Sequence, residues 1–173
     1  TVITSSDNIF SSSDKKKHII VSCGESGLSL RMFVPVAALF NHDITFTGEG
    51  SILTRPIDFF DEVLPKLKVC IQSNNGRLPI TIKGPLQPTD ISVDGSLSSQ
   101  FLTGLLIAYA KACTKPVSIK ANNLASKPYI SLTLDMLKHF GFRVENENYE
   151  KFTILPRQVP GGHSIKYRVE GDW

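Results

Sequence analysis

Short stretches in which apolar and polar residues alternate are separated along the chain by longer stretches with apolar residues at helical spacing. Alternation with a period of two predicts strands, and apolar residues three or four positions apart predict amphipathic helices. We predict helices over 24–40, with a kink at Pro35, and over 54–68, 96–112 and 126–141. We predict strands over 18–23, 43–48, 68–73, 78–84, 90–95, 116–121, 142–148, 151–156 and 164–171. Strands that alternate with helices indicate an α/β protein.

Residues suited to helix ends support the second and fourth of these helices. Thr54 can cap the second helix, with Pro56 in its first turn. Ser126 and Pro128 have the same positions in the fourth helix, and Gly141 is suited to end it. Both helices are therefore predicted to begin at a turn of the form Thr/Ser-Arg/Lys-Pro.

The order strand, helix, strand, helix, hairpin occurs twice, and related residues recur 71 or 72 positions apart. The first hairpin is predicted to turn at Asn74-Asn75-Gly76. A repeat of this length predicts duplicated βαβαββ units with mixed sheets, because solenoid units are only about 20–50 residues long. The related positions are Gly24 and Gly95, Thr54-Arg55-Pro56 and Ser126-Lys127-Pro128, and Ile-Thr-Ile at 80–82 and Phe-Thr-Ile at 152–154.

The repeat divides the chain into four segments. They are an irregular N-terminal lead-in over 1–19, a first βαβαββ unit over 20–94, a second unit over 95–158, and a last strand within 159–173. The sequence begins with threonine rather than methionine and ends abruptly, so we expect it to be part of a longer protein.

Composition and charge exclude some classes of function. Of the 173 residues, 41% are hydrophobic and 20% charged, which is typical of a globular protein. A net charge of +3 without a long cationic block argues against nucleic acid as a partner. No apolar run approaches the ~20 residues of a membrane-spanning helix, so we expect no membrane partner. The three cysteines and four histidines form no metal-binding pattern; we expect no metal, no cofactor, and reduced thiols in the cytoplasm.

The predicted helix starts are rich in groups that bind anions. A helix N-terminus carries unpaired N–H donors and about half a positive charge, to which serine hydroxyls and arginine or lysine side chains add. If the four starts converge, they form a pocket for a small molecule with more than one phosphate or carboxylate. The residues are Gly24, Ser26, Gly27, Ser29, Arg31, Thr54 and Arg55 in the first unit, and Ser96, Ser98, Ser99, Gln100, Ser126 and Lys127 in the second.

Ordinary capping is the alternative explanation for these turns, because Ser, Thr and Gly are common at helix starts. Gln100 favours a binding role, since it is a long polar residue one turn into a helix, where an apolar residue would pack better. From the residues alone, both readings of the Gly-Ser-Leu-Ser-Ser-Gln segment stay open.

The motifs at these helix starts resemble those of the 5-enolpyruvylshikimate-3-phosphate synthase (3-phosphoshikimate 1-carboxyvinyltransferase) family. The matching segments are VDGSLSSQFLTGLL, LASKPYISLTLDMLKHFG, YRVEGD and TRPIDFFDEVL. The resemblance runs from about residue 20 to 172 and corresponds to about two-fifths of a family enzyme, the larger part of its N-terminal domain. It implies the enolpyruvyl transferase fold, in which each domain has three βαβαββ units with helices packed inside; this chain has about two of the three.

The resemblance implies a role for each matching residue. Ser98, Ser99 and Ser126 are expected to bind the phosphate of shikimate 3-phosphate. Gln100 is expected beside the shikimate ring and the enolpyruvyl group, and Tyr129 in the same pocket. On the phosphoenolpyruvate side, which is also the site of the herbicide glyphosate, the implied residues are Arg55, Gly27 and Arg31. Lys127 is a further candidate, as is Asp172 at the crossover between domains.

The first turn departs from the family pattern G-N-A-G-T-x-x-R at two positions. Glu25 replaces asparagine and Leu28 replaces threonine, while the glycines and Arg31 match. No contact is carried over to these two positions, and glyphosate sensitivity is not predicted.

The family's acid and base residues have no counterpart in residues 1–173, and neither has its N-terminal K-S-x-x-x-R segment. We therefore expect these residues to bind substrate, to need the C-terminal domain of the same protein as a partner, and to be inactive alone. Two alternatives stay open: a transferase of the same fold with UDP-N-acetylglucosamine as acceptor, and an RNA-end-processing or RNA-binding protein of similar fold.

Overall fold

The computed structural model describes residues 18–96, 99–157 and 167. Its first unit consists of β1 (Ile19–Ser22), α1 (Gly27–Ala37), β2 (Asp43–Thr47), the 3-10 helix η1 (Gly50–Thr54), α2 (Phe59–Val63), the 3-10 helix η2 (Leu64–Leu67), β3 (Cys70–Ser73) and β4 (Ile80–Lys83). Its second unit consists of β5 (Ile91–Asp94), α3 (Ser99–Ala112), β6 (Val117–Asn122), α4 (Lys127–His139), β7 (Arg143–Glu147) and β8 (Lys151–Leu155).

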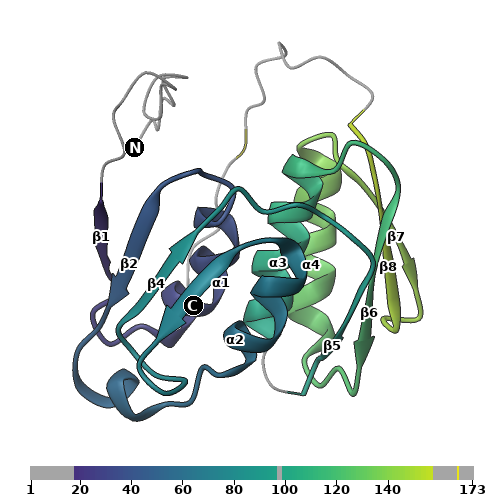
Figure 1. The fold of residues 1–173 in the computed structure, drawn as a ribbon. Coiled ribbons are helices and arrows are strands. Elements are labelled where there is room, and N and C mark those ends of the chain that lie inside the picture. Colours follow the sequence, from purple (N-terminus) through teal and green to yellow (C-terminus); the bar gives the residue numbers. More distant parts are fainter. Residues whose placement is uncertain (1–17, 97–98, 158–166, 168–173) are drawn as a thin grey trace.

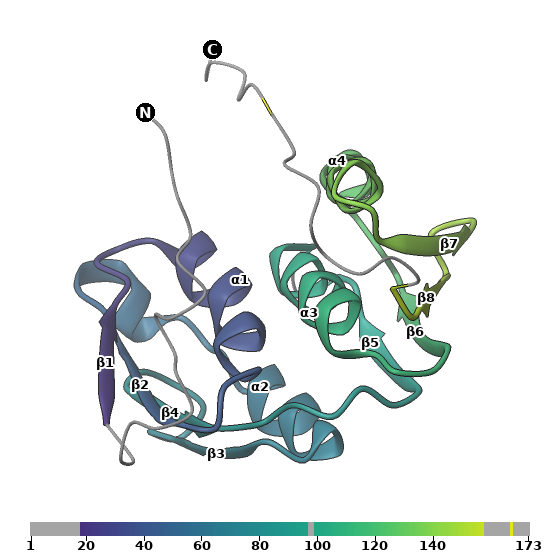
Figure 2. The ribbon, with the colours of Figure 1, turned by 90° about the horizontal axis from the view of Figure 1, so that it is seen from above.

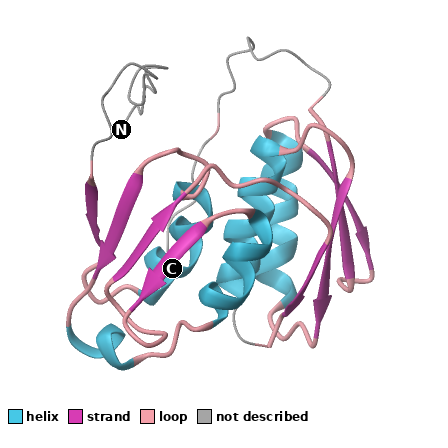
Figure 3. Cartoon of the chain, viewed as in Figure 1, coloured by secondary structure: helices cyan, strands magenta, loops and turns pink. Residues whose placement is uncertain are grey.

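Each unit contains one four-stranded mixed sheet of the same topology. The strand orders are β1-β2-β4-β3 and β5-β6-β8-β7. In each sheet the first pair is parallel and the other two are antiparallel. The long helices α1, α3 and α4 lie between the two sheets (Figures 1, 2 and 3). This confirms the expected α/β class with mixed sheets and helices packed inside.

The register of the strands confirms the duplication. Phe46 of β2 pairs with Ile80 of β4, and Ile119 of β6 pairs with Phe152 of β8. The two Xaa-Thr-Ile segments therefore occupy the same place in the two sheets. Their apolar residues face the helices and are buried, while the threonines between them are half-buried on the other face.

The predicted division after residue 94 is wrong by one strand. β5 pairs in parallel with β6, with Ile91 opposite Ile119, so it belongs to the second sheet and not to the first. A parallel pair needs a crossover, and α3 supplies it. Of the lead-in predicted over 1–19, the structure describes only residues 18 and 19, and of the last strand predicted within 159–173 it describes only Tyr167.

The prediction of one continuous helix over 54–68 is also wrong. The segment forms part of η1, then α2 and η2, and Arg55 between them is extended, with φ −74° and ψ 131°. The cause is Pro56, because the residue before a proline is sterically excluded from the helical region. Thr54 therefore ends η1 instead of capping a longer helix, and its hydroxyl donates to the Ser51 carbonyl at 3.0 Å.

Other predicted ends and turns agree with the structure. Gly141 follows α4 with a φ of 80°, in the left-handed region that glycine adopts without strain. The first hairpin turns at Asn75 and Gly76, whose φ values are 50° and 70°. Pro35 lies inside α1, which ends two residues later.

The two units join where α3 packs against α1. An ideal Cβ built on Gly104 of α3 would lie 2.4 Å from the backbone oxygen of Met32 in α1. The helices can approach this closely only because Gly104 has no side chain. Around the contact, Leu30 and Val34 of α1 and Leu105 of α3 are fully buried.

Further contacts between the units surround this crossing. The rings of Phe59 and Phe60 in α2 lie 4.9 and 5.1 Å from the ring of Phe101 in α3. The buried Tyr109 hydroxyl donates to the Thr89 carbonyl at 2.9 Å and so fixes the segment between β4 and β5. Burial raises the pKa of Tyr109 far above its ordinary value, which keeps the hydroxyl protonated as a donor.

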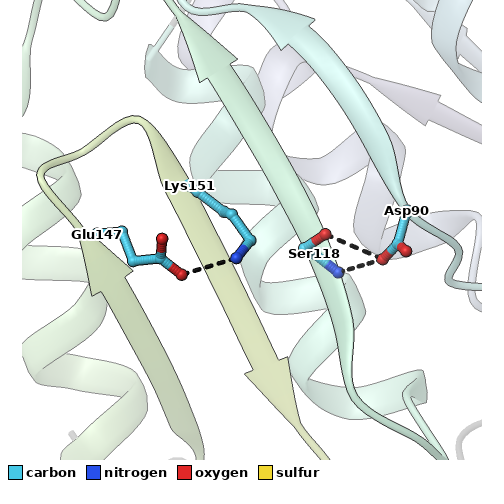
Figure 4. Close-up of polar contacts among 4 residues, drawn as sticks. All are labelled: Asp90, Ser118, Glu147 and Lys151. Carbon is cyan, nitrogen blue, oxygen red and sulfur yellow. Dashed lines mark hydrogen bonds and ion pairs between the residues drawn. The ribbon is translucent and has the colours of Figure 1, made fainter.

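On the outer face of the second sheet, polar side chains tie neighbouring strands together (Figure 4). Asp90 accepts hydrogen bonds from the Ser118 backbone N–H at 2.7 Å and the Ser118 hydroxyl at 3.0 Å. These bonds lower the pKa of Asp90, and Lys115 and Lys151 lower it further. Glu147 and Lys151 form an exposed ion pair at 2.7 Å on the adjacent hairpin.

We predict that Gly104→Ala destabilises the fold. Alanine in place of glycine inside a helix ordinarily stabilises by about 1 kcal/mol. Here the added methyl group meets a backbone oxygen that cannot rotate away, and overpacking of this kind costs about 3 kcal/mol. Urea denaturation should show a net loss of ~2 kcal/mol. A gain in stability would contradict the close approach of the helices.

We predict that Asp90→Ala destabilises the protein at neutral pH and has less effect in acid. A carboxyl group with a lowered pKa stabilises the fold above its ordinary pKa of 3.8, and this contribution is lost as the pH falls through the lowered value. The gap between the denaturation midpoints of wild type and Asp90→Ala should therefore narrow in acid. Glu147→Gln, which breaks only an exposed pair, is the control and should change the midpoint little. A gap that stays constant as the pH falls would contradict the role of the charge.

Candidate substrate-binding site

The first turns of α3 and α4 line one pocket, whose third wall is the first turn of α1. Its volume is about 420 Å³. The lining residues are Leu28 and Met32 from α1, Ser99, Gln100 and Thr103 from α3, Ser126 just before α4, and Tyr129, Leu132 and Thr133 from α4. The structure thus brings together four residues that the sequence assigned to shikimate 3-phosphate, although they lie up to 30 positions apart.

The hydroxyl groups at these helix starts differ in what they do. Ser26 caps α1: its Oγ accepts from the Ser29 backbone N–H at 3.1 Å and from the Ser29 hydroxyl at 2.9 Å. Ser126 has the corresponding position before α4, but its side chain makes no capping hydrogen bond. Capping therefore explains Ser26 and not Ser126, whose hydroxyl lines the pocket.

The pocket also faces two helix N-termini. α3 and α4 have 14 and 13 residues, long enough for each to carry about half a positive charge at its start. Pro128 in the first turn of α4 has no N–H, but the neighbouring backbone donors of that turn lack helical partners. An anion between Ser99 and Ser126 would meet both positive ends at once.

Beside this pocket, two guanidinium groups meet over Gly27. An ideal Cβ at Gly27 would lie 3.0 Å from Nη1 of Arg31 and 3.3 Å from Nη1 of Arg55. Arg31 comes from one turn further along α1, whereas Arg55 follows η1. The next residue after Gly27, Leu28, lines the pocket, so the arginine pair and the pocket are adjacent.

The arginine pair is electrostatically strained without an anion. Burial lowers the pKa of Arg31, and the positive charge of Arg55 lowers it further. The Nε of Arg31 is buried and has no hydrogen-bond partner among the described residues. A bound phosphate or carboxylate would offset the repulsion and accept hydrogen bonds from both side chains.

The two residues that depart from the family pattern have distinct surroundings. The Glu25 carboxylate lies against Gly50, where a Cβ would be only 2.5 Å from its Oε1. The Glu49 N–H donates to the Gly24 carbonyl at 2.8 Å, which holds the same two loops together. Leu28 is half-exposed and gives the pocket an apolar wall.

The remaining candidate residues lie elsewhere. Lys127 is exposed, with its Nζ 5.4 Å from the centre of the Tyr149 ring, and it does not line the pocket. Ser98 and Asp172 lie outside the described residues.

Sequence reasoning missed four residues of the pocket, Met32, Thr103, Leu132 and Thr133. Thr103 and Thr133 follow Ser99 and Tyr129 by four positions, so each faces the same side of its helix as a residue already identified. Helical spacing from the known residues was a signal that could have found both. Met32 had no such signal, because its place depends on the approach of α1 to α3.

No group of three or more His, Cys, Asp or Glu residues in the described ranges is placed to hold a metal ion. No described helix has both the length and the apolarity needed to cross a bilayer. The three cysteines are free thiols, of which Cys23 and Cys113 are buried and Cys70 is exposed.

Comparison with known proteins decides the family. The sequence profile described as EPSP synthase (3-phosphoshikimate 1-carboxyvinyltransferase) matches residues 1–173. The chain belongs to the EPSP synthase family. Among curated proteins named 3-phosphoshikimate 1-carboxyvinyltransferase, that of Clostridium novyi is 37% identical over 153 residues, and that of Clostridium beijerinckii is 37% identical over 171 residues.

The solved structure of EPSP synthase from Acinetobacter baumannii has a similar fold. It aligns with a TM-score of 0.66 and 26% sequence identity over 85% of this chain and 32% of that one. The two Clostridium alignments include 88% and 99% of this chain, but only 35% and 39% of the Clostridium proteins. It therefore spans less than half the length of its EPSP synthase relatives. Neither alternative function is favoured by these matches.

We predict that Gly27→Ala weakens binding of phosphate-bearing anions at the arginine pair. The added methyl group would displace the two guanidinium groups by a few tenths of an ångström. With phosphoenolpyruvate as the probe, isothermal titration should show about fivefold weaker binding, because one hydrogen bond contributes about 1 kcal/mol. Phe33→Ala, which removes an exposed side chain from the same helix, should leave affinity unchanged. Equal affinity in Gly27→Ala and wild type would contradict the site.

Proposed function

We propose that this chain forms the substrate-binding part of 3-phosphoshikimate 1-carboxyvinyltransferase, which transfers the enolpyruvyl group of phosphoenolpyruvate to the 5-hydroxyl of shikimate 3-phosphate. The observation that carries the proposal is the pocket at the starts of α3 and α4, with the Arg31–Arg55 pair beside it. The two substrates carry one phosphate each, and the site has two adjacent places for an anion.

Shikimate 3-phosphate fits the pocket between α3 and α4. Its phosphate lies at the two helix starts, where the Ser99 and Ser126 hydroxyls and backbone N–H groups donate to it; Ser98 joins them. Gln100, half-buried in the pocket, donates and accepts at the ring hydroxyls. The exposed Tyr129 ring covers the outer side of the ligand.

Phosphoenolpyruvate fits the arginine pair. Arg55 is exposed and can form a bidentate contact with the phosphate of phosphoenolpyruvate. Arg31 is less exposed and places a second positive charge next to the same phosphate. Gly27 allows the ligand to approach the backbone at the start of α1. The enolpyruvyl carbon then lies toward Leu28 and Gln100, next to the acceptor.

The reaction needs an acid and a base in addition to this site. The methylene carbon of phosphoenolpyruvate takes a proton, and the 5-hydroxyl loses one as its oxygen attacks C2. The phosphate then leaves while the new methyl group gives up a proton, which restores the carbon–carbon double bond of the enolpyruvyl group. We assign these proton transfers to the rest of the enzyme, and to this chain the binding and orientation of both substrates. Closure of the other domain over the pocket excludes water from the reacting groups.

The remaining assignments rest on the sequence. Lys127 and Asp172 are further candidates for contact with the substrates, Asp172 at the crossover to the other domain. The enzyme works in the cytoplasm, where the three free cysteines of this chain stay reduced, and it uses no cofactor. Neither nucleic acid nor a membrane is a partner.

We predict that shikimate 3-phosphate binds with Ser99 and Ser126 as its anchors. In the full-length protein, Ser99→Ala and Ser126→Ala should each weaken binding about tenfold or more, because each removes a hydrogen bond to a charged group. Ser92→Ala, on the outer face of β5, is the matched control and should bind as wild type does. Isothermal titration decides the question. Binding of a UDP sugar in place of shikimate 3-phosphate, or no effect of either serine, would refute the proposal.

A further inference from the structure

Two threonines form a buried hydrogen bond between α3 and α4. Thr103 Oγ1 and Thr133 Oγ1 are 3.0 Å apart, and each residue is only 8% exposed. In the described part of the chain they are the only buried residues with a hydroxyl, amide or charged side chain, apart from Tyr109. Apolar residues would fill the same space without needing hydrogen-bond partners, so this pair needs an explanation.

The direction of the hydrogen bonds follows from a second contact. The Thr133 hydroxyl donates to the Tyr129 carbonyl at 2.8 Å. A hydroxyl has one proton, so the proton between the two threonines must come from Thr103. The chain of bonds therefore runs from Thr103 in α3, through Thr133, to the backbone of Tyr129 in the first turn of α4.

This chain of bonds lies directly behind the proposed binding site. Thr103 is four residues after Ser99, and Thr133 is four residues after Tyr129, so each threonine lies about 6 Å along its helix from a residue that lines the pocket. Both threonines line the pocket together with Ser99 and Ser126. A slide or rotation of α4 against α3 would break the bond and move the anchoring groups of one helix relative to the other.

We propose that Thr103 and Thr133 are positioning residues that fix the register of α3 against α4 for binding of the phosphorylated acceptor. The proposal rests on the function proposed above, in which that acceptor is shikimate 3-phosphate. The apolar contacts around the pair hold the helices together but do not fix their register, because they are non-directional. The hydrogen bond requires one alignment, in which Ser99, Gln100, Ser126 and Tyr129 face a single ligand.

Valine substitutions separate positioning from stability. Thr133→Val leaves the Thr103 hydroxyl buried without its acceptor, whereas Thr103→Val leaves Thr133 bonded to Tyr129. Thr133→Val should therefore lower the melting temperature more than Thr103→Val. The double variant replaces both partners by apolar groups of similar shape, which is nearly neutral for stability. It keeps the packing and loses the register.

The experiment measures melting temperature and affinity for shikimate 3-phosphate in the full-length protein, for wild type, both single variants and the double variant. We expect the double variant to melt close to wild type but to bind about five- to tenfold more weakly, the effect of about one hydrogen bond. Ser131→Ala is the control: Ser131 makes the same kind of bond to the Lys127 carbonyl at 3.2 Å, but its hydroxyl contacts Tyr149 rather than α3. It should bind as wild type does.

Hydrogen exchange provides a readout that needs no ligand. Exchange at the first turns of α3 and α4 should be faster in the double variant than in wild type at equal melting temperature. Wild-type affinity in the double variant, or unchanged exchange at these turns, would overturn the positioning role. Failure of the wild-type protein to bind shikimate 3-phosphate would instead overturn the proposed function, and the exchange data would then decide the positioning role by themselves.

Discussion

The close contact of α3 with α1 at Gly104 is the constraint on which the site depends. The two helices belong to different units, and each carries part of the site at its N-terminal end. With no side chain at Gly104, the backbone of α3 reaches the Met32 carbonyl of α1, and Leu28 comes to line the same pocket as Ser99. A larger residue at this crossing would separate the arginine pair from the pocket between α3 and α4.

The site concentrates positive charge, and the ion pairs among the described residues do not include its two arginines. Two helix starts face the pocket, and two arginines meet beside it. The Nε of Arg31 is buried without a hydrogen-bond partner in the described part of the chain, and the lowered pKa of Arg31 reflects both burial and the repulsion by Arg55. Protein interiors rarely keep such an arrangement for stability alone, because buried charges are usually paired. Two bound anions, one at the helix starts and one at the arginine pair, would neutralise this charge.

Sequence reasoning succeeded where the local pattern determines the structure. The duplication, the two mixed sheets and the ends at Gly141 and Asn75-Gly76 follow from periodicity and turn chemistry. The motifs named Ser99, Gln100, Ser126 and Tyr129, which line one pocket, and their binding roles stay predictions. Sequence reasoning failed at Arg55, where the steric effect of Pro56 overrides an apparent helical pattern. The division after residue 94 failed because strand pairing is a long-range property: β5 could be assigned to a sheet only once its partner β6 was known.

The pocket residues that were missed have a similar physical origin. Thr103 and Thr133 lie on different helices 30 positions apart, and nothing local in the sequence shows that they share a hydrogen bond. The meeting of Arg31 and Arg55 over Gly27 likewise depends on how the two parts of the first unit fold together. The sequence could name the charged groups, but only the fold shows that they are adjacent.

A crystal structure of the full-length protein with shikimate 3-phosphate bound would show whether the starts of α3 and α4 form one phosphate site. We expect the ligand phosphate within hydrogen-bonding distance, about 3 Å, of both Ser99 Oγ and Ser126 Oγ. A phosphate bound away from these two helix starts would contradict this expectation.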